Sequence, residues 1–344
     1  MTAASTGALL GPAGIAALAA WVLVGLVRSY SIRRAVLDHP TDRSSHSVPT
    51  PRGGGLGLIL AFLVAFGVSA FSEGIDWRVG VALGGVVFTA IVGWLDDHAG
   101  LPVGARLAAH IAAGLTLLPL ALTPDPVPSW LGPAAVLWWI LWAVSAINVV
   151  NFMDGIDGLI GLQALIFGIH LWAASPEPTL THSYGLLLAS ASLGFLIWNW
   201  APAKIFLGDV GSGALGAAMA LGGLLLLRET THSLVSAYLP LYPIFLDAAV
   251  TLARRAWRGE RLTVAHRSHL YQHLANGGWG HGRVSALYGA VSVLGAALVR
   301  AQGTAQGVTF GAYIVLIAAF GWLLERNLKG AQAGGSGWPP HSTP

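Results

Sequence analysis

Adjacent carboxylates interrupt an otherwise apolar sequence at a position that suits cation binding. Asp96 and Asp97 stand in the string GWLDDHAGL, directly after a long apolar stretch. Carboxylate oxygens at such a boundary can bind Mg²⁺ or position a cation that is itself bound to phosphate. A pair of acids on an exposed surface is the alternative, and the pair alone does not decide between the two.

The string NVVNFMDGIDGL carries a side-chain oxygen at every third residue. These residues are Asn148, Asn151, Asp154 and Asp157. Residues three apart lie on one side of a helix, and Gly155 allows a tight turn within the string. Polar side chains in an apolar region are costly unless they face a cavity or a partner. The string therefore indicates a binding site, with a purely structural polar cluster as the alternative.

The string NWAPAKIFLGDVGSG combines an aromatic side chain, an acid and several glycines. Asn199 ends the preceding apolar stretch, and Phe206 offers a ring on which a base can stack. Gly208, Asp209 and Ser212 stand where the next apolar stretch begins. Glycines at the amino terminus of a helix expose backbone N–H groups to an anion, and the helix dipole supports its binding. Asp209 would hold a cation against that anion, or would only cap the helix.

Cationic and donor side chains occur in the first two polar loops. Arg43, His46 and Arg52 lie in DHPTDRSSHSVPTPRGGG, and Arg106 follows the acidic pair. Such residues suit phosphate groups. An anchor for anionic lipid is the alternative interpretation of the first loop.

The last polar loop contains HRSHLYQH, in which His266, Arg267, His269 and His273 fall within eight residues. Zinc binding through the histidines is disfavoured because the interleaved arginine repels a cation. An anion site fits better, and a basic segment that lies on the membrane is the alternative.

Asp247 stands apart from these strings, inside an apolar stretch that reads YPIFLDAAVTLARR. An ionisable residue within a membrane span is a functional candidate by default. Pairing with an arginine near the membrane surface explains it equally well.

Long apolar segments must position these strings. The chain of 344 residues is 55% hydrophobic and only 10% charged, with a mean hydropathy of +0.67. Soluble domains carry about 25% charged residues, so this composition excludes a large soluble protein. The lack of cysteine excludes disulfides and thiolate metal sites. A window of about 20 apolar residues predicts eleven spans, near residues 8–28, 53–72, 78–95, 104–122, 132–150, 158–174, 183–199, 212–227, 234–252, 284–300 and 308–325.

The basic residues predict how these spans are oriented. Of the 18 Lys and Arg residues, 15 fall on one set of alternate loops, and only Arg78, Arg228 and Arg300 fall on the other. Short basic loops stay in the cytoplasm, so we expect the amino terminus outside and the carboxyl terminus inside. The polar strings all lie on the basic side. The predicted fold is an all-α transmembrane bundle in one domain, residues 1–329, with a disordered cytoplasmic tail, residues 330–344.

Together these features suit a nucleoside diphosphate and a second anionic partner. They offer acids for Mg²⁺, a helix amino terminus for phosphate, an aromatic ring for a base and a cationic loop. Because every loop lies at the membrane surface, the second partner is expected to be a lipid. The implied chemistry is phosphoryl transfer, which depends on positioning and charge neutralisation.

The four strings DDHAGL, NVVNFMDGIDGL, NWAPAKIFLGDVGSG and HRSHLYQH resemble those of the polyprenyl-phosphate N-acetylhexosamine-1-phosphate transferase family, from about Asp38 to Arg283. The resemblance implies a Mg²⁺-dependent enzyme, with Mn²⁺ as a substitute, that joins a UDP-N-acetylhexosamine to undecaprenyl phosphate. It also implies the bacterial inner membrane, with the site on its cytoplasmic face, and no nucleic-acid partner. A homodimer is a further expectation.

The resemblance also assigns roles to single residues. Asp209 and Asp97 are expected to bind the metal, and Asp96 and Asp97 match the essential acidic pair of the family. His266 and His269 resemble its histidine motif near the diphosphate. Phe206 is expected to stack on uracil. The other substrate-binding residues expected are Arg43, His46, Arg52, Arg106, Asn148, Asn151, Asp154, Asp157, Asn199, Gly208, Ser212 and Arg267.

The chain departs from the muramoyl-pentapeptide enzymes of the family in three places. It has HRSH where they have adjacent histidines, it has only Arg106 where they carry further lysines, and it has an eleventh span. These differences favour a simple sugar, GlcNAc or a 6-deoxy relative, and a role in starting O-antigen or a related polysaccharide.

Two other functions fit the sequence less well. An ion-coupled transporter should place its polar residues in mid-span, at broken helices, whereas here they lie at span ends. A prenyltransferase of aromatic acceptors would need two Asp-rich motifs, and DDHAG is not spaced like one.

Overall fold

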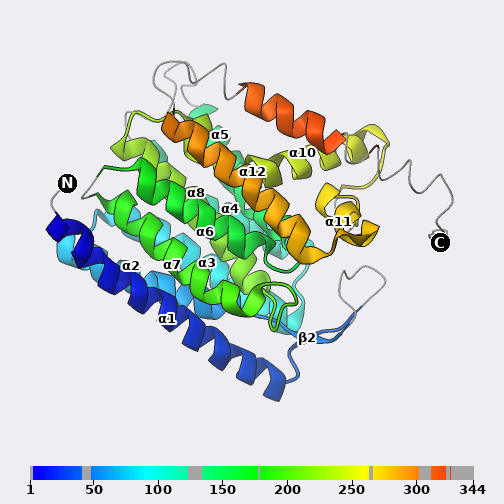
Figure 1. Cartoon of the computed structure of the whole chain (residues 1–344), viewed down its shortest axis with the longest axis horizontal. Coiled ribbons are helices and arrows are strands. Elements are labelled where there is room, and N and C mark those ends of the chain that lie inside the picture. Colours follow the sequence, from blue (N-terminus) through cyan, green and yellow to red (C-terminus); the bar gives the residue numbers. More distant parts are fainter. Residues whose placement is uncertain are drawn as a thin grey trace.

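The computed structural model describes residues 3–40, 48–122, 134–176, 179–262, 266–301, 311–322 and 326. Most of these residues are helical (Figure 1). The first half contains α1 (Ala3–Arg33), β1 (Leu37–Asp38), β2 (Thr50–Pro51), α2 (Gly55–Glu73), α3 (Trp77–Ala99), α4 (Val103–Ala121) and α5 (Ala134–Met153). The second half contains α6 (Leu159–Ala174), α7 (Leu180–Asn199), α8 (Asp209–Glu229), α9 (Leu234–Tyr238), η2 (Leu239–Leu241), α10 (Tyr242–Trp257), α11 (Leu270–Leu274), η3 (Ala275–Trp279) and α12 (His281–Ala301). A further apolar helix covers Gly311–Trp322.

The helices confirm a polytopic helical membrane protein. Eight of them, in the part of the chain that the structure describes, are long and apolar enough to cross a bilayer, and three shorter apolar helices accompany them. Within the described residues, ten of the eleven predicted apolar segments fall on a single helix, and the segment 234–252 covers α9, η2 and part of α10. The number of spans and the orientation of the termini stay predictions.

The expectation of an entirely helical fold misses a short antiparallel ladder. Leu37 pairs with Pro51, and Asp38 pairs with Thr50. This ladder joins the two ends of the connection between α1 and α2, and it holds Arg52 directly before α2. Two residues per strand leave no alternating pattern that a sequence analysis could detect.

Helix α8 is the central element of the bundle (Figure 1). It is buried along its full length and packs against α3 and α5, with further contacts to α2, α6 and α7. Its sequence, DVGSGALGAAMALGGLLLLRE, is rich in glycine and alanine. Small residues let helix backbones approach closely in a membrane protein, so α8 can be surrounded by other helices.

The polar strings gather at one end of this bundle. Asp96 and Asp97 lie near the carboxyl end of α3, and Asp209 is the first residue of α8. Arg78 and Arg228 lie at the opposite ends of the same two helices. This arrangement agrees with the assignment of the loops to two sides.

The crossing of α3 and α8 generates a stability prediction. A Cβ at Gly93 would lie 2.6 Å from the backbone nitrogen of Val210, whereas a Cβ at Gly84, in the same helix, would have nothing within 4 Å. Alanine favours a helix by about 1 kcal/mol over glycine. We expect Gly84→Ala to leave the thermal midpoint of the purified protein unchanged or slightly raised. We expect Gly93→Ala to lower it by several degrees, because overpacking costs about 1–3 kcal/mol. Equal midpoints for the two variants would contradict the close approach.

Candidate active site

A polar cavity of about 290 Å³ opens where the end of α3 and the connections α5–α6 and α7–α8 meet. It brings together nine of the residues that the sequence predicted for the site. They are Arg52, Asp97, Asn151, Asp154, Asp157, Asn199, Phe206, Gly208 and Asp209.

Asp97 joins α3 to the amino terminus of α8. Its buried carboxylate accepts hydrogen bonds from the backbone N–H groups of Asp209 and Val210, both at 3.1 Å. The first N–H groups of a helix have no partner within the helix, and its dipole favours a negative charge there. Arg52 approaches the same carboxylate to 3.8 Å and donates to the Asp97 carbonyl. Asp97 therefore fixes where α8 begins.

Asp96 faces a second, much smaller space. Arg106 forms an ion pair with its carboxylate at 3.2 Å, and the Leu101 amide donates to it at 2.5 Å. The space beside it has a volume of about 10 Å³ and is also lined by Asp209 and Asn151. A volume of about 10–15 Å³ holds a single water molecule. Asp96 and Asp209 thus share a space the size of one water or one small ion.

Asp157 is held firmly between two connections. It accepts a hydrogen bond from the Ala203 amide at 3.0 Å, and His281 Nδ1 lies 3.2 Å from its other oxygen. Both Asp157 and His281 line the cavity.

Asp154 has a different environment from Asp157. Among the described residues, no hydrogen bond reaches its carboxylate. Burial raises the pKa of Asp154 well above the ordinary aspartate value, and repulsion from Asp209, Asp97 and Asp157 raises it further. The cavity therefore concentrates negative charge that a cation would relieve.

Asn199 and Phe206 are placed by bonds between distant segments. Asn199 accepts from the Gly158 amide and donates to the Ile205 carbonyl, both at 3.0 Å. The backbone of Phe206 donates to the Pro51 carbonyl and accepts from the Gly54 amide. The connection α7–α8 is thus fixed by the starts of α6 and α2, which holds the Phe206 ring at the cavity wall.

Several predicted residues support the cavity without lining it. Ser212 donates to Asn151 at 2.7 Å, and Asn148 lies 3.2 Å from His110 Nδ1. Arg106 lies beside the smaller space. Arg43 and His46 fall outside the described residues.

His266, Arg267 and His269 do not line the cavity, although Gln272 of the same string does. His266 contacts Ser268 at 2.9 Å, buried His269 lies against Asp247, and Arg267 is half-buried. Burial, and then repulsion from His269, lowers the pKa of His266 to about 4, so this ring is neutral near pH 7. The catalytic role of both histidines stays a prediction.

Several residues beside these spaces were not predicted from the sequence, and four of them carry ionisable or amide side chains. Asp38, Gln272 and His281 line the main cavity, and His110 lines the smaller space. Gln272 falls within the HRSHLYQH string and could have been chosen from it. His281 follows a glycine-rich turn, and nothing in its spacing points to Asp157.

The oxygen ligands suit Mg²⁺ more than a metal that needs a full protein shell. Within the described ranges, no group of three or more His, Cys, Asp or Glu side chains could hold a metal on its own. Mg²⁺ commonly uses one or two carboxylates and completes its shell with water and substrate phosphates. Asp209 fits that pattern. Both oxygens of Asp97 already accept backbone hydrogen bonds, so its predicted role as a ligand is less well supported.

The chain is similar to one protein family over part of its length and to individual relatives over most of it. Residues 79–227 match the model of Glycosyl transferase family 4. That region contains the acidic pair, the NVVNFMDGIDGL string and the start of α8. The resemblance predicted from these motifs is confirmed.

Individual relatives extend over most of the chain. A probable undecaprenyl-phosphate N-acetylglucosaminyl 1-phosphate transferase of Bacillus subtilis is 29% identical, over 79% of this chain and 78% of its own. A decaprenyl-phosphate N-acetylglucosaminephosphotransferase of Mycolicibacterium smegmatis is 27% identical, over 92% and 89%. A phospho-N-acetylmuramoyl-pentapeptide-transferase of a Synechococcus strain is 29% identical, over 82% and 84%.

The crowding of carboxylates predicts how stability depends on pH. A carboxyl group whose pKa is raised by folding destabilises the folded protein once it ionises, so the penalty is absent in acid and grows as the pH rises above the ordinary aspartate range. We expect Asp154→Asn to raise the thermal midpoint by a few degrees at pH 8 in EDTA, and to leave it unchanged near pH 4. Asp76→Asn, at the other end of α3, is the control and should show no such rise. A midpoint of Asp154→Asn that stays at or below wild type at pH 8 would contradict the crowding.

Proposed function

We propose that this protein transfers an N-acetylhexosamine-1-phosphate from a UDP-sugar to undecaprenyl phosphate and releases UMP. The observation that carries the proposal is the convergence of Asp97, Asp154 and Asp209 with an aromatic ring and Arg52 on one cavity at the start of α8. The relatives named for polyprenyl-phosphate sugar-phosphate transfer support it.

The nucleotide part of the substrate would occupy the cavity wall formed by α7–α8 and α5–α6. Phe206 would stack on uracil, while Asp157 and Asn199 hold the backbone beneath it. The diphosphate would then lie toward Asp209. Gly208, with φ +76°, leaves room there, because a Cβ would lie 2.6 Å from an Asp97 oxygen.

Charge neutralisation is the main demand on such a site, because two anionic substrates meet beside carboxylates. Asp209 would hold Mg²⁺, with Asp97 as a second candidate ligand. The bound ion would offset the charge of the diphosphate. Arg52 and Arg106 lie on either side of the acidic pair and supply further positive charge.

The bond changes are those of one phosphoryl transfer. An oxygen of the lipid phosphate forms a bond to the β-phosphorus of the UDP-sugar. The bond from that phosphorus to the bridging oxygen breaks, and UMP leaves with the electron pair. A phosphate monoester has a second pKa of about 6, so it is largely dianionic at pH 7. Asp96, whose oxygens already bind Arg106 and Leu101, therefore acts as a positioning group rather than a base.

The finer assignments are part of the same proposal. The sugar is GlcNAc or a 6-deoxy relative, and the product starts O-antigen or a related polysaccharide. The enzyme resides in the bacterial inner membrane with its site facing the cytoplasm, where the basic loops are expected. It is proposed to use Mg²⁺, and a homodimer remains part of the expectation.

A transfer assay tests the reaction directly. Purified protein, Mg²⁺ and undecaprenyl phosphate are incubated with a panel of radiolabelled UDP-sugars, and UMP release is measured. We expect release with one or more N-acetylhexosamines, and a loss of about 100-fold or more in Asp209→Asn. Asp76→Asn is the matched control and should keep full activity. If no sugar yields UMP, the proposed function fails.

The role of Asp96 is tested by the pH dependence of its variant. If Asp96 is a base, its loss matters less at high pH, because the lipid phosphate is then already deprotonated. If Asp96 is a positioning group, high pH does not compensate for its loss. We therefore expect Asp96→Asn to stay impaired, relative to wild type, from pH 6.5 to 8.5. Recovery of the full wild-type rate at pH 8.5 would instead show that Asp96 is a base.

A further inference from the structure

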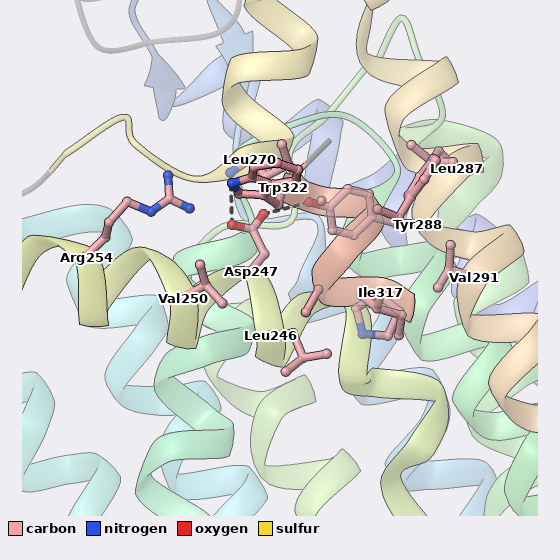
Figure 2. Close-up of a pocket in the computed structure, with 14 residues that line it drawn as sticks. Leu246, Asp247, Val250, Arg254, Leu270, Leu287, Tyr288, Val291, Ile317 and Trp322 are labelled. Atoms are coloured by element: carbon pink, nitrogen blue, oxygen red, sulfur yellow. Dashed lines mark hydrogen bonds between the residues drawn. The ribbon is translucent and has the colours of Figure 1, made fainter. Parts of the chain in front are cut away.

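Asp247 lies outside the polar cavity. It lines a separate, mostly apolar pocket of about 320 Å³ between α10, α12 and the helix Gly311–Trp322 (Figure 2). Its side chain is 3% exposed. The residues around it in that pocket include Leu246, Val250 and Ile317. Asp247 therefore does not touch a substrate bound in the polar cavity.

The carboxylate of Asp247 is surrounded by donors. Leu270 donates its backbone N–H group at 2.9 Å, and the Tyr288 hydroxyl donates at 2.6 Å (Figure 2). The backbone N–H group of Tyr271 donates to the same carboxylate at 3.1 Å. The Thr251 hydroxyl lies at 3.2 Å, and His269 Nδ1 is 3.5 Å away. A buried charge is tolerated only when hydrogen bonds compensate its lost hydration, and here three elements supply them.

These bonds hold the segment that carries the histidine loop, residues 266–274, at the start of α11. From that segment Tyr271 crosses to the last turn of α5 and donates its hydroxyl to the Phe152 carbonyl at 3.2 Å. Its ring packs so closely on Gly155 that a Cβ there would lie 3.0 Å from Cζ. The next residue, Gln272, lines the polar cavity.

We propose that Asp247 is a positioning residue, which anchors the 266–274 segment so that Tyr271 packs on Gly155 and Gln272 lines the substrate cavity. The carboxylate acts at the far side of that segment from the substrate. Two backbone amides and a tyrosine hydroxyl donate to Asp247, and together they use both oxygens of its carboxylate. An ionised acceptor forms stronger hydrogen bonds than a neutral one. The proposal rests on the proposed function only for the identity of the substrate.

Two measurements on Asp247→Asn test the proposal. The asparagine side chain has nearly the same volume as that of aspartate. Its NH₂ group cannot accept a hydrogen bond, however, and must face one of the donors. We expect faster hydrogen exchange at the amides of Leu270 and Tyr271. We also expect a rise of about tenfold in KM for the UDP-sugar, with KM for the lipid phosphate within about twofold of wild type.

Ser292→Ala is the matched control on α12. The Ser292 hydroxyl lies one turn from Tyr288 and donates to Gln163 at 2.9 Å, so it is also buried but does not touch the segment. We expect this variant to leave exchange at Leu270 and Tyr271, and both KM values, as in wild type. If the two variants shift KM equally, Asp247 has only a general structural role and the proposal fails.

Tyr288→Phe keeps the proposal testable if Asp247→Asn does not fold. It removes one bond and retains both backbone bonds, so exchange at Leu270 and Tyr271 should increase by a smaller factor. Unchanged exchange in a folded variant of either kind would overturn the anchoring role. The exchange measurement needs no substrate. If wild type releases no UMP while the variants exchange faster, the proposed function fails and the anchoring role stands.

Discussion

The contact between the Asp97 carboxylate and the first amides of α8 is the interaction on which the site depends. It ties the end of α3 to the start of the central helix, and the helix dipole makes a carboxylate favourable at that point. Because α8 begins there, Asp209 is delivered beside Asp97 and Asp96. The close crossing at Gly93 serves the same contact, since a side chain there would separate the two backbones.

That arrangement creates a problem of charge, which the rest of the site addresses. Five carboxylates line one cavity, those of Asp38, Asp97, Asp154, Asp157 and Asp209. Burial raises the pKa of Asp154, and repulsion from Asp209, Asp97 and Asp157 raises it further. Arg52 and Arg106 each balance one member of the acidic pair, and His281 approaches Asp157. The remaining excess of negative charge is consistent with a divalent cation.

The buried acids of this protein have two distinct uses. Asp154 has no hydrogen-bond partner among the described residues and faces the cavity, so its carboxylate is available to a ligand. Asp247 receives donors from α11 and α12 and lines an apolar pocket. From the sequence alone, Asp247 could be either a functional group within the membrane or the partner of an arginine. In the structure, two backbone amides and a tyrosine hydroxyl donate to its carboxylate.

The sequence by itself determined the helices and the motifs, because both depend on local properties. The length of each apolar segment predicted a long helix, because a membrane span needs about 20 apolar residues. Strings such as NVVNFMDGIDGL indicated the binding loops, because burying polar groups in an apolar region is costly. Only the tertiary structure decided which side chains meet. No local pattern predicts that His281 approaches Asp157, or that Asn148 and Ser212 lie behind the cavity wall. No local pattern predicts either that Gln272 lines the cavity while His269, three residues earlier, does not. Those outcomes depend on contacts between segments more than a hundred residues apart, such as the hydrogen bond from the Asp209 amide to the Asp97 carboxylate. The spacing of residues within one segment cannot predict such contacts.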